Sequence, residues 1–221
     1  MNHLMNMEQA RFNMIEQQIR PWDVLDAHVL HLLSVVKRED FVPVAHKALA
    51  FVDMEIPLPG GQVMLAPRVE ARLLQDLAVQ KHEMVLEIGA GSGYMAALLA
   101  HRAQHVITLE IHSQLVALAR SNLQQAGVHN AEVRHLDGAR GVPVEGPFDV
   151  ILLSGSVANL PPSLLAHLKV GGRLGAIVGE EPMMRTTFVS RLGETQYRTT
   201  QPWDTVAPRL QNFPEPSQFR F

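Results

Sequence analysis

A short segment near the middle of the chain constrains the fold more than any other feature. Residues 85–94 read Val-Leu-Glu-Ile-Gly-Ala-Gly-Ser-Gly-Tyr, an apolar run that leads into three glycines at alternate positions. Gly89 and Gly91 allow a sharp turn and a close approach of a ligand to the backbone, and Gly93 lets the following helix pack near that turn. Backbone N–H groups at the start of this helix are then free to bind a polar ligand. The segment therefore predicts a strand, a ligand-binding turn and a helix.

The chain around this motif alternates between strands and helices. Short apolar runs predict strands over 84–88, 106–109, 132–136, 150–153 and 174–178. The helices expected between them cover 94–103, 114–126 with Ser113 as its N-cap, and 162–168. This alternation predicts an α/β fold with a Rossmann-like, mostly parallel, doubly wound sheet and helices on both faces. Two further runs that flank Gly193, over 187–192 and 195–200, predict a C-terminal antiparallel hairpin.

The N-terminal part of the chain has a helical rhythm instead. Phe12, Ile15 and Ile19 are spaced three and four residues apart, so we expect them to share one face of a helix. Pro21 is expected to end that helix, because proline has no N–H to donate and clashes with the preceding turn. Asp26 has the side chain and the position of an N-cap for a second helix.

Between these helices and the glycine motif lies a segment rich in proline and glycine, over 40–62, which is expected to form a loop. A third helix is expected to begin at Arg68. We therefore predict N-terminal helices with a substrate-side loop over 1–80, packed on a cofactor-binding core over 81–221 in one compact unit.

Composition excludes several classes of function. The 221 residues include no cysteine, which rules out disulfides, thiolate catalysis and cysteine-based zinc sites and fits a cytoplasmic location. The net charge of −3 weighs against nucleic acid or an anionic membrane as the main partner. We expect neither partner, no membrane-spanning segment, no secretory signal, and a monomer. The histidine pairs 28/31 and 101/105 lack an acidic third ligand, so no metal site is expected.

Two carboxylates follow the glycine motif at the ends of predicted strands. Glu110 lies 21 positions after Gly89, where a carboxylate can accept both hydroxyls of a ribose. Asp137 ends the next strand and precedes Gly138. Open α/β sheets bind their ligands at the carboxyl ends of strands, so these acids are expected to meet the glycine turn. The spacing departs from that of a dinucleotide site, because the bulky Tyr94 takes the place of the third glycine.

The pattern E-x-G-x-G-x-G from Glu87 to Gly93 resembles motif I of the class I S-adenosylmethionine-dependent methyltransferases. The resemblance implies S-adenosylmethionine as the cofactor and an adenine amino group as the partner of Asp137. The cofactor-binding residues that it implies are Glu87, Gly89, Gly91, Gly93, Glu110, Asp137 and Gly138.

Most of the chain also resembles the protein-L-isoaspartate O-methyltransferases. Residues 38–43, Arg-Glu-Asp-Phe-Val-Pro, resemble the R-x-x-F-V-P signature of that family, and residues 50–53 and 56–62 resemble its A-Y-x-D and L-P-I-G-x-G-Q segments. The resemblance implies methylation of the α-carboxylate of isoaspartyl residues in damaged proteins, which is a repair reaction. The implied partner is a protein or peptide that bears isoaspartate. Asp53 and Gln62, polar residues of the substrate-side loop, are the implied catalytic residues, together with position 65.

One departure falls at the expected acceptor site. The family segment continues G-Q-T-I-S-x-P, whereas this chain has Val63 in place of the threonine and Leu65 in place of the serine. In the family that serine lies near the transferred methyl group, and Leu65 has no hydroxyl to donate. Two alternatives therefore stand beside isoaspartate repair: a methyltransferase with another acceptor, and a cofactor-binding protein without turnover.

Overall fold

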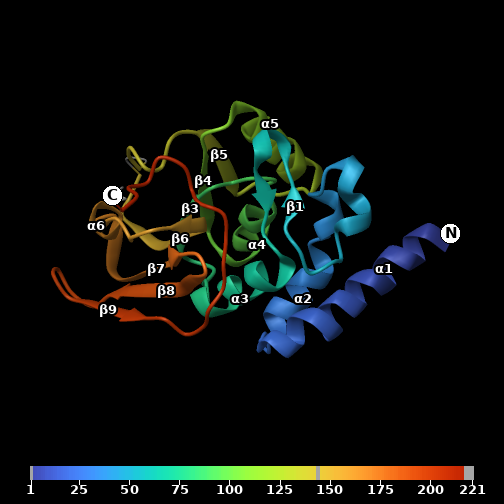
Figure 1. Cartoon of the computed structure of the whole chain (residues 1–221), viewed down its shortest axis with the longest axis horizontal. Helices are drawn as coiled ribbons and strands as arrows, with labels where there is room; N and C mark the ends of the chain where they lie inside the picture. The colour runs from blue at the N-terminus through green and yellow to red at the C-terminus, as the bar shows by residue number, and fades with distance from the viewer. Residues whose placement is uncertain (1, 143–144, 217–221) are drawn as a thin grey trace, which may run out of the picture.

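The computed structural model describes residues 2–142 and 145–216, and its centre is a single seven-stranded sheet in the order β5-β4-β3-β6-β7-β8-β9 (Figure 1). These strands are β3 (Met84–Ile88), β4 (His105–Glu110), β5 (Ala131–His135), β6 (Phe148–Val157), β7 (Leu168–Glu180), β8 (Met183–Arg191) and β9 (Tyr197–Thr200). β5, β4, β3, β6 and β7 run parallel, and β8 and β9 continue antiparallel. The predicted class, the parallel sheet and the terminal hairpin are confirmed, although β8 begins earlier than expected. The last five residues of the expected core, 217–221, lie outside the described chain.

The helices that cover the sheet are distributed unevenly. They are α3 (Pro67–Leu77), α4 (Tyr94–Arg102), α5 (Ser113–Gln125) and α6 (Pro162–Leu165). Alternate residues of the central strands β3, β4 and β6 belong to two separate apolar clusters, as the twofold period of a strand requires. Val85 and Val106 pack with α3, α4 and α5, whereas Leu86 and Ile107 pack with α6 and with Phe213 near the C-terminus. The second face is thus covered by one short helix and irregular chain rather than by a full layer of helices.

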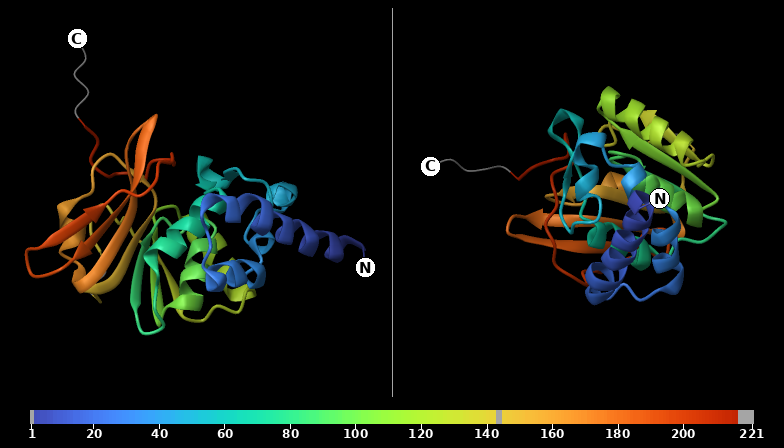
Figure 2. Two further views of the ribbon diagram at one scale, coloured as in Figure 1. Left: turned by 90° about the horizontal axis from the view of Figure 1, so that it is seen from below. Right: turned by 90° about the vertical axis from the view of Figure 1, so that its right-hand side faces the viewer.

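The N-terminal helices pack at the end of the molecule opposite the β8–β9 hairpin (Figure 2). They comprise α1 (Asn2–Met14), a π-helical turn (Ile15–Ile19), a 3₁₀ turn (Arg20–Trp22) and α2 (Ala27–Val35). Asp26 caps α2 as predicted, since its carboxylate accepts the N–H of His28 at 2.7 Å. The prediction for Phe12 is wrong, because Phe12 is 59% exposed while Ile15 and Ile19 are buried. The buried face carries Arg11, Met14, Ile15 and Ile19, and Phe12 lies outside it on the exposed side of α1.

The N-terminal helices share one apolar core with the sheet, because residues from both sides of position 80 belong to the same buried cluster. The boundary at residue 80 stays a prediction. None of the helices in the described chain is long and apolar enough to cross a membrane.

Two local expectations are corrected by the structure. Ser113 is the first residue of α5 rather than its cap; the N-cap position is taken by His112, which makes no side-chain capping bond. The helix expected over 162–168 ends at Leu165, because Leu168 already begins β7. The carbonyl of His167 accepts the N–H of Phe148 at 2.7 Å, so this part of the chain pairs with β6 and cannot continue a helix.

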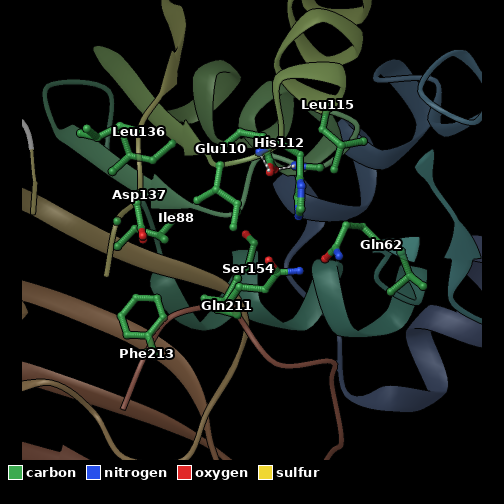
Figure 3. A pocket seen from close by; sticks show the side chains of 17 residues that line it. Gln62, Ile88, Glu110, His112, Leu115, Leu136, Asp137, Ser154, Gln211 and Phe213 are labelled. Atoms are coloured by element: carbon green, nitrogen blue, oxygen red, sulfur yellow. Dashed lines mark hydrogen bonds between the residues drawn. The ribbon is translucent and has the colours of Figure 1, made fainter. Parts of the chain in front are cut away.

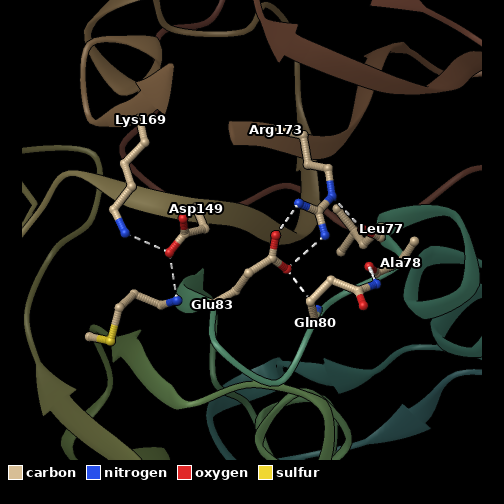
Figure 4. A network of polar contacts seen from close by, with 8 residues as sticks. Leu77, Ala78, Gln80, Glu83, Asp149, Lys169 and Arg173 are labelled. Atoms are coloured by element: carbon tan, nitrogen blue, oxygen red, sulfur yellow. Dashed lines mark hydrogen bonds and ion pairs between the residues drawn. The ribbon is translucent and has the colours of Figure 1, made fainter. Parts of the chain in front are cut away.

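Ion pairs join the amino ends of the central strands (Figure 4). Arg173 of β7 donates to both carboxylate oxygens of Glu83 at 2.7 and 2.9 Å, and Asp149 of β6 accepts from Lys169 and from the N–H of Met84, both at 2.8 Å. Burial acts to raise the pKa of Glu83, but the hydrogen bonds from Arg173 and from the N–H of Gln80, together with the charge of Arg173, outweigh this and lower it. These contacts fix the strands at one edge of the sheet and leave the opposite, carboxyl edge free to form a site.

Candidate functional site

A pocket opens at the carboxyl ends of β3, β4 and β5, where the sequence predicts a ligand (Figure 3). Six predicted site residues line it: Gln62, Gly89, Gly91, Glu110, Asp137 and Gly138. The remaining wall is largely apolar and includes Ile88, Leu109, Ile111, Leu115 and Leu136. An apolar pocket with a few convergent polar groups is the usual form of a small-molecule site.

The glycine turn is held against β4 by its backbone. The N–H groups of Gly89 and Ala90 both donate to the carbonyl of Leu109, at 2.9 and 3.1 Å. Gly89, Gly91 and Gly93 have φ values of +98°, +52° and +85°, in the region that glycine adopts more easily than other residues. A Cβ at Gly93 would lie 3.2 Å from the backbone of Ala119 in α5. Gly93 therefore serves the packing of the helix, as predicted, and does not line the pocket.

Glu110 has a structural contact besides its place in the pocket. Its carboxylate accepts the N–H of Gly91 at 2.9 Å and the N–H of His112 at 3.0 Å, and the residue is only 6% exposed. The acid thus connects the end of β4 to the glycine turn and to the start of α5. Because a carboxylate has about four acceptor positions, these two bonds leave room for hydroxyl groups of a ligand.

Asp137 lies on the side of the pocket opposite Gln62 (Figure 3). One of its oxygens accepts the N–H of Ala139 at 3.0 Å, and the other accepts from the side-chain amide of Asn212 at 2.7 Å. Asn212 has a φ of +66°, a left-handed conformation that asparagine tolerates better than most residues. The chain on either side of Asn212 contributes Gln211 and Phe213 to the pocket wall.

A small hairpin brings Gln62 to the pocket. It consists of β1 (Ile56–Pro57) and β2 (Val63–Met64), within the segment that the sequence predicts as a loop. The Leu58 side chain lies 3.4 Å from the place where a Cβ on Gly91 would stand, so the hairpin packs directly on the glycine turn. Val63, which replaces a threonine of the family pattern, lines the pocket as well.

Glu87 lies beneath the glycine turn rather than in the pocket. It is fully buried and accepts hydrogen bonds from Ser154 Oγ at 2.6 Å and Thr108 Oγ1 at 2.7 Å. Burial raises the pKa of Glu87 to about 7 in spite of these two bonds. Ser154 also lines the pocket, and Glu87 itself lines a small cavity beside Gly89 and Ser154.

Asp53 and Leu65 line a second cleft, and Leu65 also lines a small cavity together with Val63 and Gly91, which border the pocket. Asp53 forms an ion pair with Arg68, the second residue of α3, and Arg68 stacks on the Trp22 ring at 4.2 Å. Leu65 is buried, and its carbonyl accepts from Arg38 at 2.7 Å. Arg38 is completely buried and also pairs with Glu70, so it fixes the chain at Leu65. The structure thus separates Asp53 from Gln62, whereas Leu65 lies between the second cleft and the pocket that Gln62 lines.

Several residues of the pocket were not predicted from the sequence. Ser154 stands on β6 without a motif, and Gln211 and Phe213 come from the C-terminal segment. His112 follows Glu110 by two positions, and this short spacing is the sequence feature that could have indicated its place in the pocket. Its buried Nε2 atom has no hydrogen-bond partner in the described chain. Among the described residues, no cluster of three His, Cys, Asp or Glu has the arrangement of a metal site.

Comparisons with known proteins agree on one family. The model for protein-L-isoaspartate(D-aspartate) O-methyltransferase matches residues 9–204. Among curated relatives, the protein-L-isoaspartate O-methyltransferase of Koribacter versatilis is 38% identical over 82% of this chain and 81% of its own length. The enzyme of the same name from Herpetosiphon aurantiacus is 36% identical over 87% of this chain and 86% of its own length.

Solved structures show the same fold. A Plasmodium falciparum chain, described as a protein-L-isoaspartate O-methyltransferase in complex with S-adenosyl-L-homocysteine, superposes with a TM-score of 0.77. It is 20% identical, and the match covers 90% of this chain and 97% of that one. With the family model and the curated relatives spanning the helices, the hairpin and the sheet alike, this chain belongs to the protein-L-isoaspartate O-methyltransferase family.

Proposed function

We propose that this protein transfers a methyl group from S-adenosylmethionine to the α-carboxylate of isoaspartyl residues in damaged polypeptides. The observation that carries the proposal is the convergence of the glycine turn, Glu110 and Asp137 on one pocket in a chain of this family. Its partner is then a protein or peptide that contains isoaspartate. We further expect a monomer in the cytoplasm.

The residues of the pocket fit the cofactor. Glu110 has acceptor positions left for ribose hydroxyls, and Asp137 can accept from an adenine amino group. Apolar side chains such as Ile111 and Leu136 can pack on the faces of a purine. The buried Nε2 of His112 can form a hydrogen bond with a polar atom of the ligand. Gln62 and Gly91 line the same pocket beside them. When bound, S-adenosylmethionine supplies an electrophilic methyl group on a sulfonium.

The task that remains for the protein is positioning. A carboxylate with a pKa near 4 is already an anionic nucleophile at neutral pH, so the reaction needs no general base. The hairpin β1–β2 and the glycine turn would align the acceptor and exclude water, which raises the rate by proximity.

One observation favours an alternative function, methyl transfer to an acceptor other than isoaspartate. Val63 and Leu65 carry no hydroxyl where the family pattern has threonine and serine, so the acceptor side is more apolar than that pattern implies.

A tritiated-methyl transfer assay with an isoaspartyl peptide and its normal aspartyl twin tests the proposal. Transfer to the isoaspartyl peptide alone is expected. No transfer to either peptide, with S-adenosylhomocysteine still bound, would refute isoaspartate as the acceptor.

A further inference from the structure

The cleft that contains Asp53 encloses about 400 Å³ and begins at Leu65, two residues beyond the part of the hairpin that lines the cofactor pocket. Its other walls come from residues 53–55, the start of α3, the turn between β7 and β8, and residues 204–206. These segments are distant in sequence and meet only in the folded protein.

The rim of this cleft is apolar and exposed. Met54, Val206 and Trp22 line it and are 41%, 50% and 37% exposed. Exposed apolar side chains that gather around a cleft mark an interaction site more often than scattered ones do. The rim therefore offers a surface on which an apolar side chain of a partner can be buried.

The charge at the cleft is negative. Asp53 is neutralised by Arg68, and Asp204 pairs with Arg185 at 3.0 Å. Glu55 lines the cleft, and no described residue forms an ion pair with it. Burial, and then the charge of nearby Glu181, raise the pKa of Glu55. Glu181 adjoins Pro182, which lines the cleft, and no described residue forms an ion pair with Glu181 either. A ligand that supplies a cation would therefore relieve the repulsion between Glu55 and Glu181.

From this combination we propose that the cleft is a subsite for the polypeptide substrate, and that it selects a lysine or arginine beside an apolar residue within a few positions of the methylated residue. The inference rests on the proposed function in one respect, that the substrate is a polypeptide. Leu65 lines the cleft and also a small cavity shared with Gly89, Gly91 and Ser154, which border the cofactor pocket. An extended chain advances about 3.3 Å per residue, so neighbours of an acceptor near Leu65 reach the cleft within one to three residues.

The test uses dye-labelled isoaspartyl peptides that differ at one flanking position, with lysine, glutamine or glutamate beside a leucine. The variable residue and its adjacent leucine are placed in turn at each of the three positions on either side of the isoaspartate. Binding to the full-length protein is measured by fluorescence anisotropy in saturating S-adenosylhomocysteine, and methyl transfer is measured in parallel. At the preferred position the lysine peptide should bind about three- to tenfold more tightly than the glutamate peptide, as expected for one cation near two partly exposed carboxylates.

Variants locate the effect. In Glu55→Gln/Glu181→Gln the ratio of the two dissociation constants should fall below about twofold, because the attractive charges are gone. Glu194→Gln, an exposed glutamate in the β8–β9 turn, should leave the ratio unchanged and is the matched control.

The outcomes separate the two proposals. Charge-selective binding without methyl transfer would support the subsite and overturn isoaspartate methylation. Methyl transfer with equal affinity for all peptides, or a preference that survives in the double variant, would overturn the subsite and leave the proposed function standing. Sedimentation that shows a dimer closed over this cleft would also overturn it, because a second copy would then be its occupant.

Discussion

The carboxylate of Glu110 accepts the backbone N–H of Gly91 at 2.9 Å, so the acid expected to hold the ribose also holds the turn expected to cradle the cofactor. Its second oxygen accepts the N–H of His112. The two strongest sequence signals in the chain are therefore one structural unit. A change at Glu110 should alter both the shape of the turn and the affinity for the ligand.

Glu110→Gln should weaken S-adenosylhomocysteine binding by about 2–3 kcal/mol, because it removes charge-assisted bonds to the ribose. It should also lower the free energy of unfolding by about 1–2 kcal/mol. The amide nitrogen of glutamine replaces one carboxylate oxygen and cannot accept the N–H that this oxygen accepts from Gly91 or His112. Calorimetry with the ligand and urea denaturation give the two values. Unchanged ligand affinity in a folded variant would contradict the role of Glu110 in the cofactor site.

Gly91 and Gly93 should respond differently to alanine. At Gly93 the new Cβ would lie 3.2 Å from the backbone of Ala119, so Gly93→Ala should destabilise the protein by about 2–4 kcal/mol from strain and overpacking. At Gly91 the nearest atom is the tip of Leu58 at 3.4 Å, so Gly91→Ala should cost only about 1–2 kcal/mol of stability, from its positive φ. Gly91→Ala should instead lose most of its cofactor affinity. Thermal melts and calorimetry on both variants measure stability and cofactor affinity. A larger loss of stability in Gly91→Ala, or a larger loss of affinity in Gly93→Ala, would contradict these roles.

Glu87→Gln should change how stability depends on pH. Glu87 has a pKa of about 7 in the folded protein and about 4.5 when unfolded, so the folded state holds its proton more tightly. The stability from that proton is present below about pH 4.5 and is lost as the pH rises through 7. Relative to wild type, Glu87→Gln should therefore gain about 2–3 kcal/mol between pH 5 and pH 8. Denaturation curves across that range test this, and parallel profiles would show that Glu87 titrates normally.

Arg38→Met should destabilise the protein by about 3–5 kcal/mol, because it leaves Glu70 buried without its cation and frees the carbonyl of Leu65. Arg38→Met/Glu70→Met should recover much of that loss, since the uncompensated charge is removed as well. The double variant should still show a raised KM for the acceptor, because the contact with Leu65 is absent. If both variants were equally unstable, the ion pair would not be the source of the effect.

Leu65→Ser should raise methyl transfer to an isoaspartyl peptide by about tenfold to a hundredfold, if a hydroxyl there replaces a water on the acceptor carboxylate. The variant should also lose about 2–4 kcal/mol of stability, because Leu65 is 7% exposed and its side chain is buried. Initial rates are compared for wild type, Leu65→Ser and Val63→Thr/Leu65→Ser at saturating cofactor. Near-zero rates in all three folded proteins would favour another acceptor or a protein without turnover.

Local patterns in the sequence predicted the sheet, most helices and the convergence of the glycine turn with two acids on one pocket. The reason is that the signals are short-ranged: a strand that enters a glycine turn, Asp26 before a helix, and acids at the ends of neighbouring strands. Because parallel strands end at the same edge, Glu110 and Asp137 were expected beside Gly91 without knowledge of side-chain contacts. The error at Phe12 shows the limit of such spacing, since residues three positions apart on a helix differ by about 60° around its axis and can lie on opposite sides of the edge of a buried face.

Tertiary structure alone decided which distant segments complete the sites. Phe213 lines the pocket, and the side-chain amide of Asn212 donates to Asp137, yet no spacing relates Asn212 to an acid 75 positions away. Asp53 was expected beside Gln62, but its pairing with Arg68 places it in the second cleft. Glu87 shares a motif with Gly89 and Gly91, and the alternation of β3 directs it into the core beside Ser154. Sequence spacing determines which face of an element a residue occupies, whereas its partners across the fold depend on how whole elements pack together.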